Sequence, residues 1–243
     1  MEGTDLTRAS VVARHPHTAG KPRPGRVRMD CHLHTVHSGD AVTTLEQMLQ
    51  GARSAGLDVI AVTDHHVVDA AKRMQEMAAD YGVQVVVGEE IRTPLGEIIG
   101  LFLTERVPYV LPLSEAAARV RDQGGVVYVP HAFDPVRSGL GRRGLDELAE
   151  SGLLDVVEVY NAKVPDESVN ELALAAAAEF GVPGGAGSDA HDPEGIGAVF
   201  IELDEFSDRD GYIQSLHGAS ITGHRYAHSR RFRTRADIER ESA

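Results

Sequence analysis

Three histidines lie within six residues in the stretch MDCHLHTVHSGD, which runs from Met29 to Asp40. If this stretch is a β-strand, the side chains of His32 and His34 point to the same face, because strand side chains alternate between faces. Paired imidazoles can bind a metal ion such as zinc. The spacing therefore predicts that His32 and His34 are metal ligands, and the alternative is a solvated, histidine-rich loop. We interpret His37 as a loop residue.

Histidine, acidic and amide residues recur directly after the later apolar runs of the chain. These runs are rich in Val and Ile, as buried β-strands are. The residues that end or follow them are Asp64 and His65, Glu89 and Glu90, His131, Asn161, and the group Ser188, Asp189 and His191. In a parallel barrel the carboxyl ends of the strands lie on one rim, which is where active sites form. The pattern therefore predicts one site shared by distant parts of the chain.

The residue types at these positions indicate which ions would bind. Imidazoles mixed with carboxylates, without a thiolate, suit Zn, Mn or Fe better than Ca or a soft metal. Five imidazoles and about four carboxylates exceed the coordination sphere of one ion, so we expect two or more ions. Neighbouring metal ions can generate hydroxide at neutral pH and neutralise charge on an ester under attack. The predicted chemistry is therefore hydrolysis.

Alternating strand-like and helix-like segments must position these residues. The predicted strands are RVRMDCH, DVIAVTD, VQVVVGEE, EIIGLFL (a hairpin or sheet neighbour of the preceding strand), VVYVPH, DVVEVYN, GGAG and AVFIEL. The predicted helices are TTLEQMLQGARSAG, residues 68–81, SEAAARVRDQGG, GLDELAESG and DESVNELALAAAAEFG. About seven strand–helix units without a linker favour an α/β barrel or a closed-up parallel sheet. A Gly-rich dinucleotide fingerprint does not follow the first strand, which argues against a Rossmann fold.

The composition argues against several classes of protein. The net charge is 24 − 37 = −13, which disfavours non-specific nucleic-acid binding and attachment to anionic membranes. The apolar runs are too short to span a membrane, and the N-terminus lacks the pattern of a signal peptide. The single cysteine, Cys31, excludes an internal disulfide and fits a reducing cytoplasm. We therefore expect a cytoplasmic protein with a small-molecule partner, and the sequence does not predict an oligomeric state.

The 243 residues are expected to form one barrel domain with two extensions. Residues 1–26 are rich in Pro, Gly and Arg and predict a flexible lead-in. Residues 27–220 carry the strand–helix pattern of the barrel. Residues 221–243 are a basic tail that is either solvated or closes over the site.

The ordered set DCHLHT, SGD, TDHH, GEE, PHAF and GSDAH resembles the motifs of the PHP (polymerase and histidinol phosphatase) superfamily over residues 29–200. The resemblance implies a distorted seven-stranded, TIM-like (β/α) barrel with a trinuclear metal centre at the C-terminal rim of the strands. It also implies phosphoesterase activity with two or three divalent ions, Mn, Fe or Zn. By position it assigns His32, His34 and Asp189 to the first metal, Glu90 to a bridge between two metals, His131 to the second metal, and Asp40, His65 and His191 to the third.

Several neighbouring residues receive other interpretations. Asn161 stands where some relatives place another ligand, so we assign it to the shell of the second metal. His65 is preferred to His66 as a ligand because it matches the TDH motif. Asp64 is expected to orient a histidine ligand.

Two further carboxylates are interpreted as structural. By strand alternation Glu89 should point away from Glu90. Glu158 is expected on the face opposite Asn161, where it would pair with a helix. Cys31 is expected to be a small core residue.

A phosphate ester also needs cations near its oxygens. Arg137 follows the fourth strand in HAFDPVRSG and is the candidate catalytic cation. Lys163, after the fifth strand, is a weaker candidate.

The predicted function is metal-dependent hydrolysis of a phosphate ester of a small molecule, by a hydroxide that bridges metal ions. The substrate can be a monoester, a cyclic ester or a diester. Arg137 would stabilise charge on the phosphorus centre, and the candidate proton donor for the leaving group is Asp189 or a metal-bound water. One alternative is an amidohydrolase-type C–N hydrolase, and another is a non-catalytic barrel that binds metal or an anion. The acidic residue on the third strand and the closing Asp-x-His favour phosphate chemistry.

Overall fold

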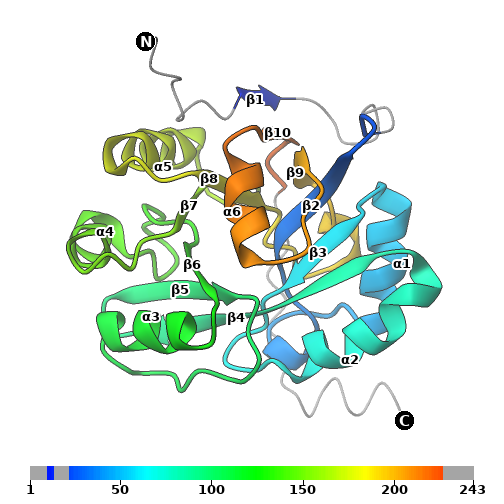
Figure 1. The fold of residues 1–243 in the computed structure, drawn as a ribbon, viewed down its shortest axis with the longest axis horizontal. Coiled ribbons are helices and arrows are strands. Elements are labelled where there is room, and N and C mark those ends of the chain that lie inside the picture. Colours follow the sequence, from blue (N-terminus) through cyan, green and yellow to red (C-terminus); the bar gives the residue numbers. More distant parts are fainter. Residues whose placement is uncertain (1–9, 14–21, 227–243) are drawn as a thin grey trace.

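The computed structural model describes residues 10–13 and 22–226, and ten of its strands form one sheet (Figure 1). Along the sheet the order is β1-β10-β9-β2-β3-β4-β5-β6-β7-β8. The bounds are β1 (Ser10–Ala13), β2 (Arg26–Leu33), β3 (Val59–Val62), β4 (Gln84–Thr93), β5 (Gly96–Leu101), β6 (Val126–Val129), β7 (Val156–Asn161), β8 (Gly184–Gly187), β9 (Val199–Asp204) and β10 (Ser220–Gly223).

The sheet is mixed, and this corrects the prediction of a parallel, seven-stranded barrel. Strands β2, β3 and β4 run parallel, as do β6, β7 and β8, but β5 is antiparallel to both of its neighbours and β9 is antiparallel to β2. Strand β5 is antiparallel to β4 because the connection between the two strands is short. Only Pro94 and Leu95 separate β4 from β5, and a two-residue turn can join only antiparallel strands. EIIGLFL is therefore the second arm of a hairpin.

The seven consecutive strands β2–β8 curl until their ends approach each other, which gives a nearly closed barrel. The residues after β8 pair with the end of β2. The Asp189 amide donates to the His32 carbonyl at 2.8 Å, and the His34 amide donates to the Ala190 carbonyl at 3.0 Å. Strands β9, β10 and β1 continue the sheet beyond β2. The α/β barrel-like architecture is thus confirmed, whereas the strand number and direction are not.

Most helices lie around the periphery of the sheet, whereas the last helix lies near the middle of the view, in front of the strands (Figure 1). The helices are α1 (Leu45–Ala55), α2 (Asp69–Met77), α3 (Leu113–Asp122), α4 (Gly141–Glu150), α5 (Glu167–Phe180) and α6 (Arg209–Leu216), with the 3-10 turns η2 (Val36–Ser38), η3 (Ala78–Tyr81) and η4 (Pro193–Gly195). The first helix starts and stops as its sequence predicts. Thr44 and Gln47 form a capping box, and Gly56 ends α1 in the left-handed conformation. No helix in the described part of the chain combines the length and apolarity that crossing a membrane requires.

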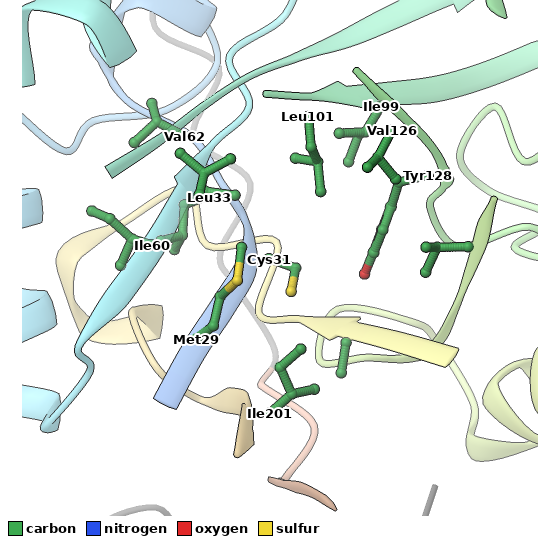
Figure 2. Close-up of a cluster of buried hydrophobic side chains, with 14 of the residues drawn as sticks. Met29, Cys31, Leu33, Ile60, Val62, Ile99, Leu101, Val126, Tyr128 and Ile201 are labelled. Carbon is green, nitrogen blue, oxygen red and sulfur yellow. The ribbon is translucent and has the colours of Figure 1, made fainter. Parts of the chain in front are cut away.

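Strand β2 contributes side chains to the apolar core and leads into the polar site. Figure 2 shows Met29, Cys31 and Leu33 of β2 in a buried cluster with side chains from β3, β5, β6 and β9. Cys31 is fully buried, as expected of a core residue. The register of β2 with β3 is irregular between Asp30 and Leu33, and the rings of His32 and His34 nevertheless point to one place, with their Nε2 atoms 3.0 Å apart. The same strand therefore anchors the core and presents two histidines.

Two strands do not fit the predicted domain boundaries. β10 crosses the boundary between residues 220 and 221, and β1 lies inside the predicted lead-in, where it pairs parallel to β10. Residues 1–9, 14–21 and 227–243 of the predicted lead-in and tail lie outside the described residues.

Closure of the barrel depends on a glycine at the end of β8. A Cβ on Gly187 would lie 2.4 Å from the His32 Cβ and 2.9 Å from Glu158 Oε1. We predict that Gly187→Ala lowers the free energy of unfolding by about 1–3 kcal/mol, because the extra methyl overpacks the contact between β8 and β2. Urea denaturation of the metal-free protein measures the change.

Gly218→Ala is the matched control, because a Cβ there meets nothing nearer than Arg26 Nη1 at 3.9 Å. We expect it to change stability by less than about 0.5 kcal/mol. Equal effects of the two substitutions would contradict the role of Gly187 in closure.

Candidate metal centre

Histidine and carboxylate side chains from six strands or strand ends converge in one buried cluster. Within each of four groups, one donor atom from every member lies within 4.8 Å of the others. The groups are His34, His65 and His191; His32, His34 and Glu90; His32, His131 and Asp189; and Glu90, Glu97 and His131. The groups share members and so form a single continuous cluster, which we call the donor cluster. Its members lie as far apart in sequence as His32 and His191.

The pair at the end of β2, His32 and the following His34, forms the centre of the donor cluster. Both His32 and His34 are fully buried, and their Nε2 atoms lie 3.0 Å apart. Glu90 Oε2 lies 3.4 Å from His32 Nε2 and 3.3 Å from His34 Nε2. Asp189 Oδ1 lies 3.7 Å and 3.5 Å from the same two atoms. The structure thus brings together the residues predicted for the first metal and the bridging Glu90.

The other ring nitrogen of each β2 histidine is held by a neighbour. His34 Nδ1 donates to Ser38 Oγ at 2.9 Å, because that hydroxyl itself donates to Asp64 Oδ1 at 2.7 Å. Asp64 therefore orients His34 through Ser38, which is the kind of role predicted for it. His32 Nδ1 lies 3.2 Å from Glu158 Oε1. Such partners fix the ring orientation and direct Nε2 into the cluster.

The position of Glu158 differs from the prediction. It is 1% exposed and faces the cluster, where it accepts from the Tyr128 hydroxyl at 3.1 Å, the His131 amide at 2.9 Å and Asn161 Nδ2 at 2.8 Å. It does not pair with a helix. The reason is an irregularity between Glu158 and Tyr160 in the register of β7 with β8. A bulge breaks strict alternation, so Glu158 and Asn161 reach the same side.

The residues predicted for the third metal also lie together. Asp40 Oδ2 is 3.4 Å from His65 Nε2 and 3.3 Å from His191 Nε2. His65 Nδ1 is 3.3 Å from Glu90 Oε2, which links this group to the centre. Asp40 Oδ1 is buried without a hydrogen-bond partner among the described residues. A second buried side-chain atom without a hydrogen-bond partner belongs to another residue next to Glu90.

The second buried atom without a hydrogen-bond partner is Nδ1 of His131, which follows β6. His131 is 3% exposed, its Nε2 is 3.1 Å from Glu90 Oε1, and its Nδ1 has no partner in the described part of the chain. Unpaired buried donors beside a carboxylate fit a bound divalent ion, because native proteins otherwise pair such atoms. The donor set of imidazoles and carboxylates fits Mn, Fe or Zn.

Glu97 on β5 is a member of the donor cluster that the sequence analysis missed. It is 4% exposed and lies opposite Arg92 of β4 in the hairpin register. Its signal in the sequence is that it is the only charged residue of EIIGLFL. Burial and the nearby charge of Glu90 raise the pKa of Glu97. Its carboxylate is therefore held close to another carboxylate inside the protein.

Asn161 lies beside the donor cluster with both ends of its amide engaged. Its Nδ2 donates to Glu158 and, at 3.3 Å, to Asp189 Oδ2. Its Oδ1 accepts from Arg137 Nη2 at 3.1 Å and from the Lys163 amide at 2.9 Å. Because these protein groups already engage the amide, its ligand role stays a prediction.

Two cationic side chains reach the edge of the donor cluster. The Arg137 guanidinium contacts Asp189 through Nη1 and pairs with Asp134 Oδ2 through Nε at 2.8 Å. Lys163 Nζ lies 2.8 Å from His191 Nδ1 and 3.6 Å from Asp189 Oδ1. Arg137 thus reaches the site as predicted, and Lys163 joins it.

Three candidate residues lie outside the donor cluster. His37 is in η2, where its amide donates to Thr35 Oγ1. The His66 ring stacks on Tyr109 with centroids 4.7 Å apart. Glu89 points away from Glu90, as predicted, and accepts from the Val107 amide at 2.7 Å.

Carboxylates determine the protonation of two of the imidazoles. Burial disfavours the charged form of His32 and His65, but facing carboxylates outweigh it. Glu90 and Glu158 raise the pKa of His32 to about 9, and Glu90 and Asp40 raise the pKa of His65 to about 9. The pKa of Glu90 itself is held well below its usual range despite its burial. The carboxylates of the metal-free cluster thus draw protons onto their neighbours.

The three remaining imidazoles of the donor cluster favour the neutral form, because their pKa values are lowered. Burial, with the adjacent Arg137 cation, lowers the pKa of His131 to about 4. Burial, with the Lys163 cation, lowers the pKa of His191 to about 4. Burial also keeps the pKa of His34 well below its usual value. Neutral imidazole is the form that binds metals.

Comparison with known families decides the identity of this arrangement. The PHP domain model matches residues 30–129, and the model described as PHP-associated matches residues 167–217. These two segments contain most of the donor cluster. The chain belongs to the PHP family.

PHP relatives differ in how much of their length this chain covers. An uncharacterized protein of Methanocaldococcus jannaschii is 37% identical over 158 residues, which are 61% of this chain and 90% of that protein. A PolC-type DNA polymerase III of Caldanaerobacter subterraneus is 32% identical over 140 residues, which are 57% of this chain but only 8% of the polymerase.

Solved structures share the fold of this PHP protein. A two-domain protein from Bacteroides vulgatus, described as containing a predicted PHP-like metal-dependent phosphoesterase, superposes with a TM-score of 0.70 at 18% identity, over 84% of this chain and 68% of that one. An amidohydrolase from Chromobacterium violaceum gives a TM-score of 0.58 at 15% identity, over 70% and 89% of the two chains. At these identities the likeness concerns the fold alone.

His34 is a member of two donor groups of the PHP domain, so its removal should weaken metal binding strongly. We predict that His34→Ala lowers the affinity for Mn²⁺ or Zn²⁺ by about a hundredfold, the upper end of the effect of removing even an outer partner of a ligand. Elemental analysis and titration calorimetry of the purified protein measure the change, and circular dichroism should show an intact fold.

His37→Ala is the matched control, because it removes an imidazole three residues away that lies outside the donor groups. Its metal content should equal that of the wild type. An unchanged metal affinity in His34→Ala would show that the donor cluster is not a metal site.

Proposed function

We propose that this PHP domain protein is a metal-dependent phosphoesterase that hydrolyses a phosphate ester of a small molecule. The observation that carries the proposal is that two cationic side chains, Arg137 and Lys163, contact the same buried cluster of imidazoles and carboxylates. Metal ions and fixed cationic donors around an anion both stabilise the charge in phosphoryl transfer. Membership of the PHP family supports metal-dependent hydrolysis, and the two cations favour an anionic substrate group.

The donor cluster offers the ligands that such an enzyme needs. Two or three divalent ions, Mn, Fe or Zn, would be held by His32, His34, Asp40, His65, Glu90, His131, Asp189 and His191. The buried, unpaired Asp40 Oδ1 and His131 Nδ1 support this assignment. Bound ions of this kind lower the pKa of water and neutralise charge on an ester.

Neighbouring side chains fix the orientation of the Arg137 guanidinium before a phosphate group binds. Its Nε is fixed by Asp134 and its Nη2 by Asn161, while Nη1 faces Asp189 in the cluster. A donor that is already oriented needs little reorganisation when charge develops on a substrate oxygen. In the proposed reaction Arg137 binds a non-bridging phosphate oxygen, and Asn161 positions the guanidinium.

Asp189 is proposed to act mainly as a ligand. Its Oδ1 faces the rings of His32 and His34, and its Oδ2 contacts Arg137. These contacts support roles in holding metal and anchoring the arginine. They give less support to the predicted role as a proton donor, because the carboxylate is already paired with cations.

The position of Arg137 generates a kinetic prediction. Arg137→Gln should lower kcat/KM for a phosphate ester by about 10² or more, the typical effect of removing one oriented donor of transition-state charge. Metal content should not fall, because the substitution removes a competing cation from Asp189. Steady-state kinetics and elemental analysis on the same samples test both statements.

Arg142→Gln is the matched control for this variant. Arg142 pairs with Asp146 and Glu179 on the surface and is remote from the donor cluster. Its kinetics should match those of the wild type. If Arg137→Gln also retained wild-type kcat/KM, Arg137 would not act on the substrate.

A substrate panel tests the proposed reaction itself. The protein, loaded separately with Mn, Fe or Zn, should release phosphate from small monoesters, or hydrolyse small cyclic esters or diesters. Dihydro-ring amides and single-stranded DNA serve as the other arms, because a similar structure is named an amidohydrolase and the polymerase relatives act with nucleic acid. The net charge of −13 argues against a polyanionic substrate. Turnover of amides alone, or of no ester with any metal, would overturn the proposal.

A further inference from the structure

Glu97 is the donor-cluster member without an assigned role. It comes from β5, the antiparallel arm of the hairpin, and its side chain is buried. One of its carboxylate oxygens lies within 4.8 Å of donor atoms of both Glu90 and His131. Three strands, β4, β5 and the end of β6, therefore deliver two carboxylates and one imidazole to one point.

Two carboxylates lie close together at this point. Glu90 and Glu97 are both buried acidic side chains, and like charges at short distance in a protein interior repel strongly. Arg92 pairs with Glu97 Oε1 through Nη2 at 3.1 Å and Nε at 3.3 Å. The Arg92 side chain is 59% exposed, however, so solvent weakens its compensation.

The third member offers a donor that needs a partner. His131 is 3% exposed, and its Nδ1 lacks a hydrogen bond among the described residues. The Oδ1 of Asn161, beside the donor cluster, already accepts from Arg137 and from the Lys163 amide. His131 Nε2 lies 3.1 Å from Glu90 Oε1, and a cation between Glu90, Glu97 and His131 would be within reach of one donor atom from each side chain.

We propose that Glu97 is a metal ligand and that it forms, with Glu90 and His131, an oxygen-rich ion position distinct from the three-imidazole position of His34, His65 and His191. Carboxylates favour harder divalent ions such as Mn²⁺, whereas imidazoles suit Zn²⁺ well. The two positions therefore prefer different ions. This inference rests on the metal-binding part of the proposed function.

Glu97→Gln tests the proposal, because it keeps the size of the side chain and removes its charge. Apo wild type and variant are titrated with Mn²⁺ and, separately, with Zn²⁺ by calorimetry, and bound ions per chain are counted by elemental analysis. We expect Glu97→Gln to lose about one Mn²⁺ per chain, or to bind it at least about tenfold more weakly. The tightest Zn²⁺ binding, assigned to the three imidazoles, should change by less than about threefold.

Thermal unfolding gives a readout that a purely structural role would not produce. Without metal, Glu97→Gln should unfold at the same or a higher temperature than wild type, because the repulsion from Glu90 is removed. With Mn²⁺ present, its stabilisation by the ion should be smaller than in wild type, because ligand-induced stabilisation follows affinity. A structural role would instead lower the metal-free midpoint and leave the Mn²⁺ effect intact.

Two variants separate the alternatives. Glu89→Gln removes the adjacent buried carboxylate, which points away from the donor cluster, so its Mn²⁺ binding should equal that of wild type. Arg92→Gln removes the ion-pair partner of Glu97 and should leave Mn²⁺ binding unchanged or stronger.

Three outcomes would count against the inference. Wild-type Mn²⁺ affinity and stoichiometry in Glu97→Gln would overturn it. An equal loss of Mn²⁺ binding in Arg92→Gln would also overturn it, because Glu97 would then act through Arg92. Absence of metal binding by the wild type itself would overturn the proposed function and this inference together, whereas the first two outcomes leave the proposed function standing.

Discussion

Buried negative charge is the constraint around which this end of the barrel is organised. Glu90 is 2% exposed, yet it lies within 3.4 Å of nitrogens on His32, His34, His65 and His131. A carboxylate in such a place must be compensated by cations or hydrogen bonds. The surrounding strands meet this requirement by directing imidazoles at it. The apolar core packs on the opposite face of β2, where it fixes the backbone that carries two of those rings.

Local rules predicted the parts of the site that depend on one strand or one strand end. Alternation predicted that His32 and His34 lie together, and they do, although the register of β2 with β3 is irregular between Asp30 and Leu33. The parallel β2–β3–β4 strands brought His65 close to Glu90, which a bridge between the two residues confirms. The predicted end of the third strand was imprecise, since β4 continues to Thr93 as part of the hairpin. Sequence patterns therefore predicted which residues lie together in the site, but they predicted the ends of the strands less well.

The missed features depend on pairing between strands, which no local pattern encodes. Glu158 reaches the cluster because of an irregular register between β7 and β8. Glu97 reaches it because β5 turns back antiparallel and pairs with both β4 and β6. The amide of Asn161 is engaged because Arg137 and Lys163, from two different loops, arrive on the same oxygen. Each of these results from relations between segments that are remote in sequence or irregular in geometry.

The hydrogen bonds that close the barrel have a consequence for exchange at the site. The His32 carbonyl and the His34 amide, which bond to the segment Asp189–Ala190, belong to the same residues whose rings lie at the centre of the donor cluster. Breaking these hydrogen bonds would therefore displace metal-binding side chains on both of the paired segments at once. Opening of the barrel at these hydrogen bonds and release of an ion would occur together. The slowest exchange of ions in the site would therefore depend on how often these hydrogen bonds open.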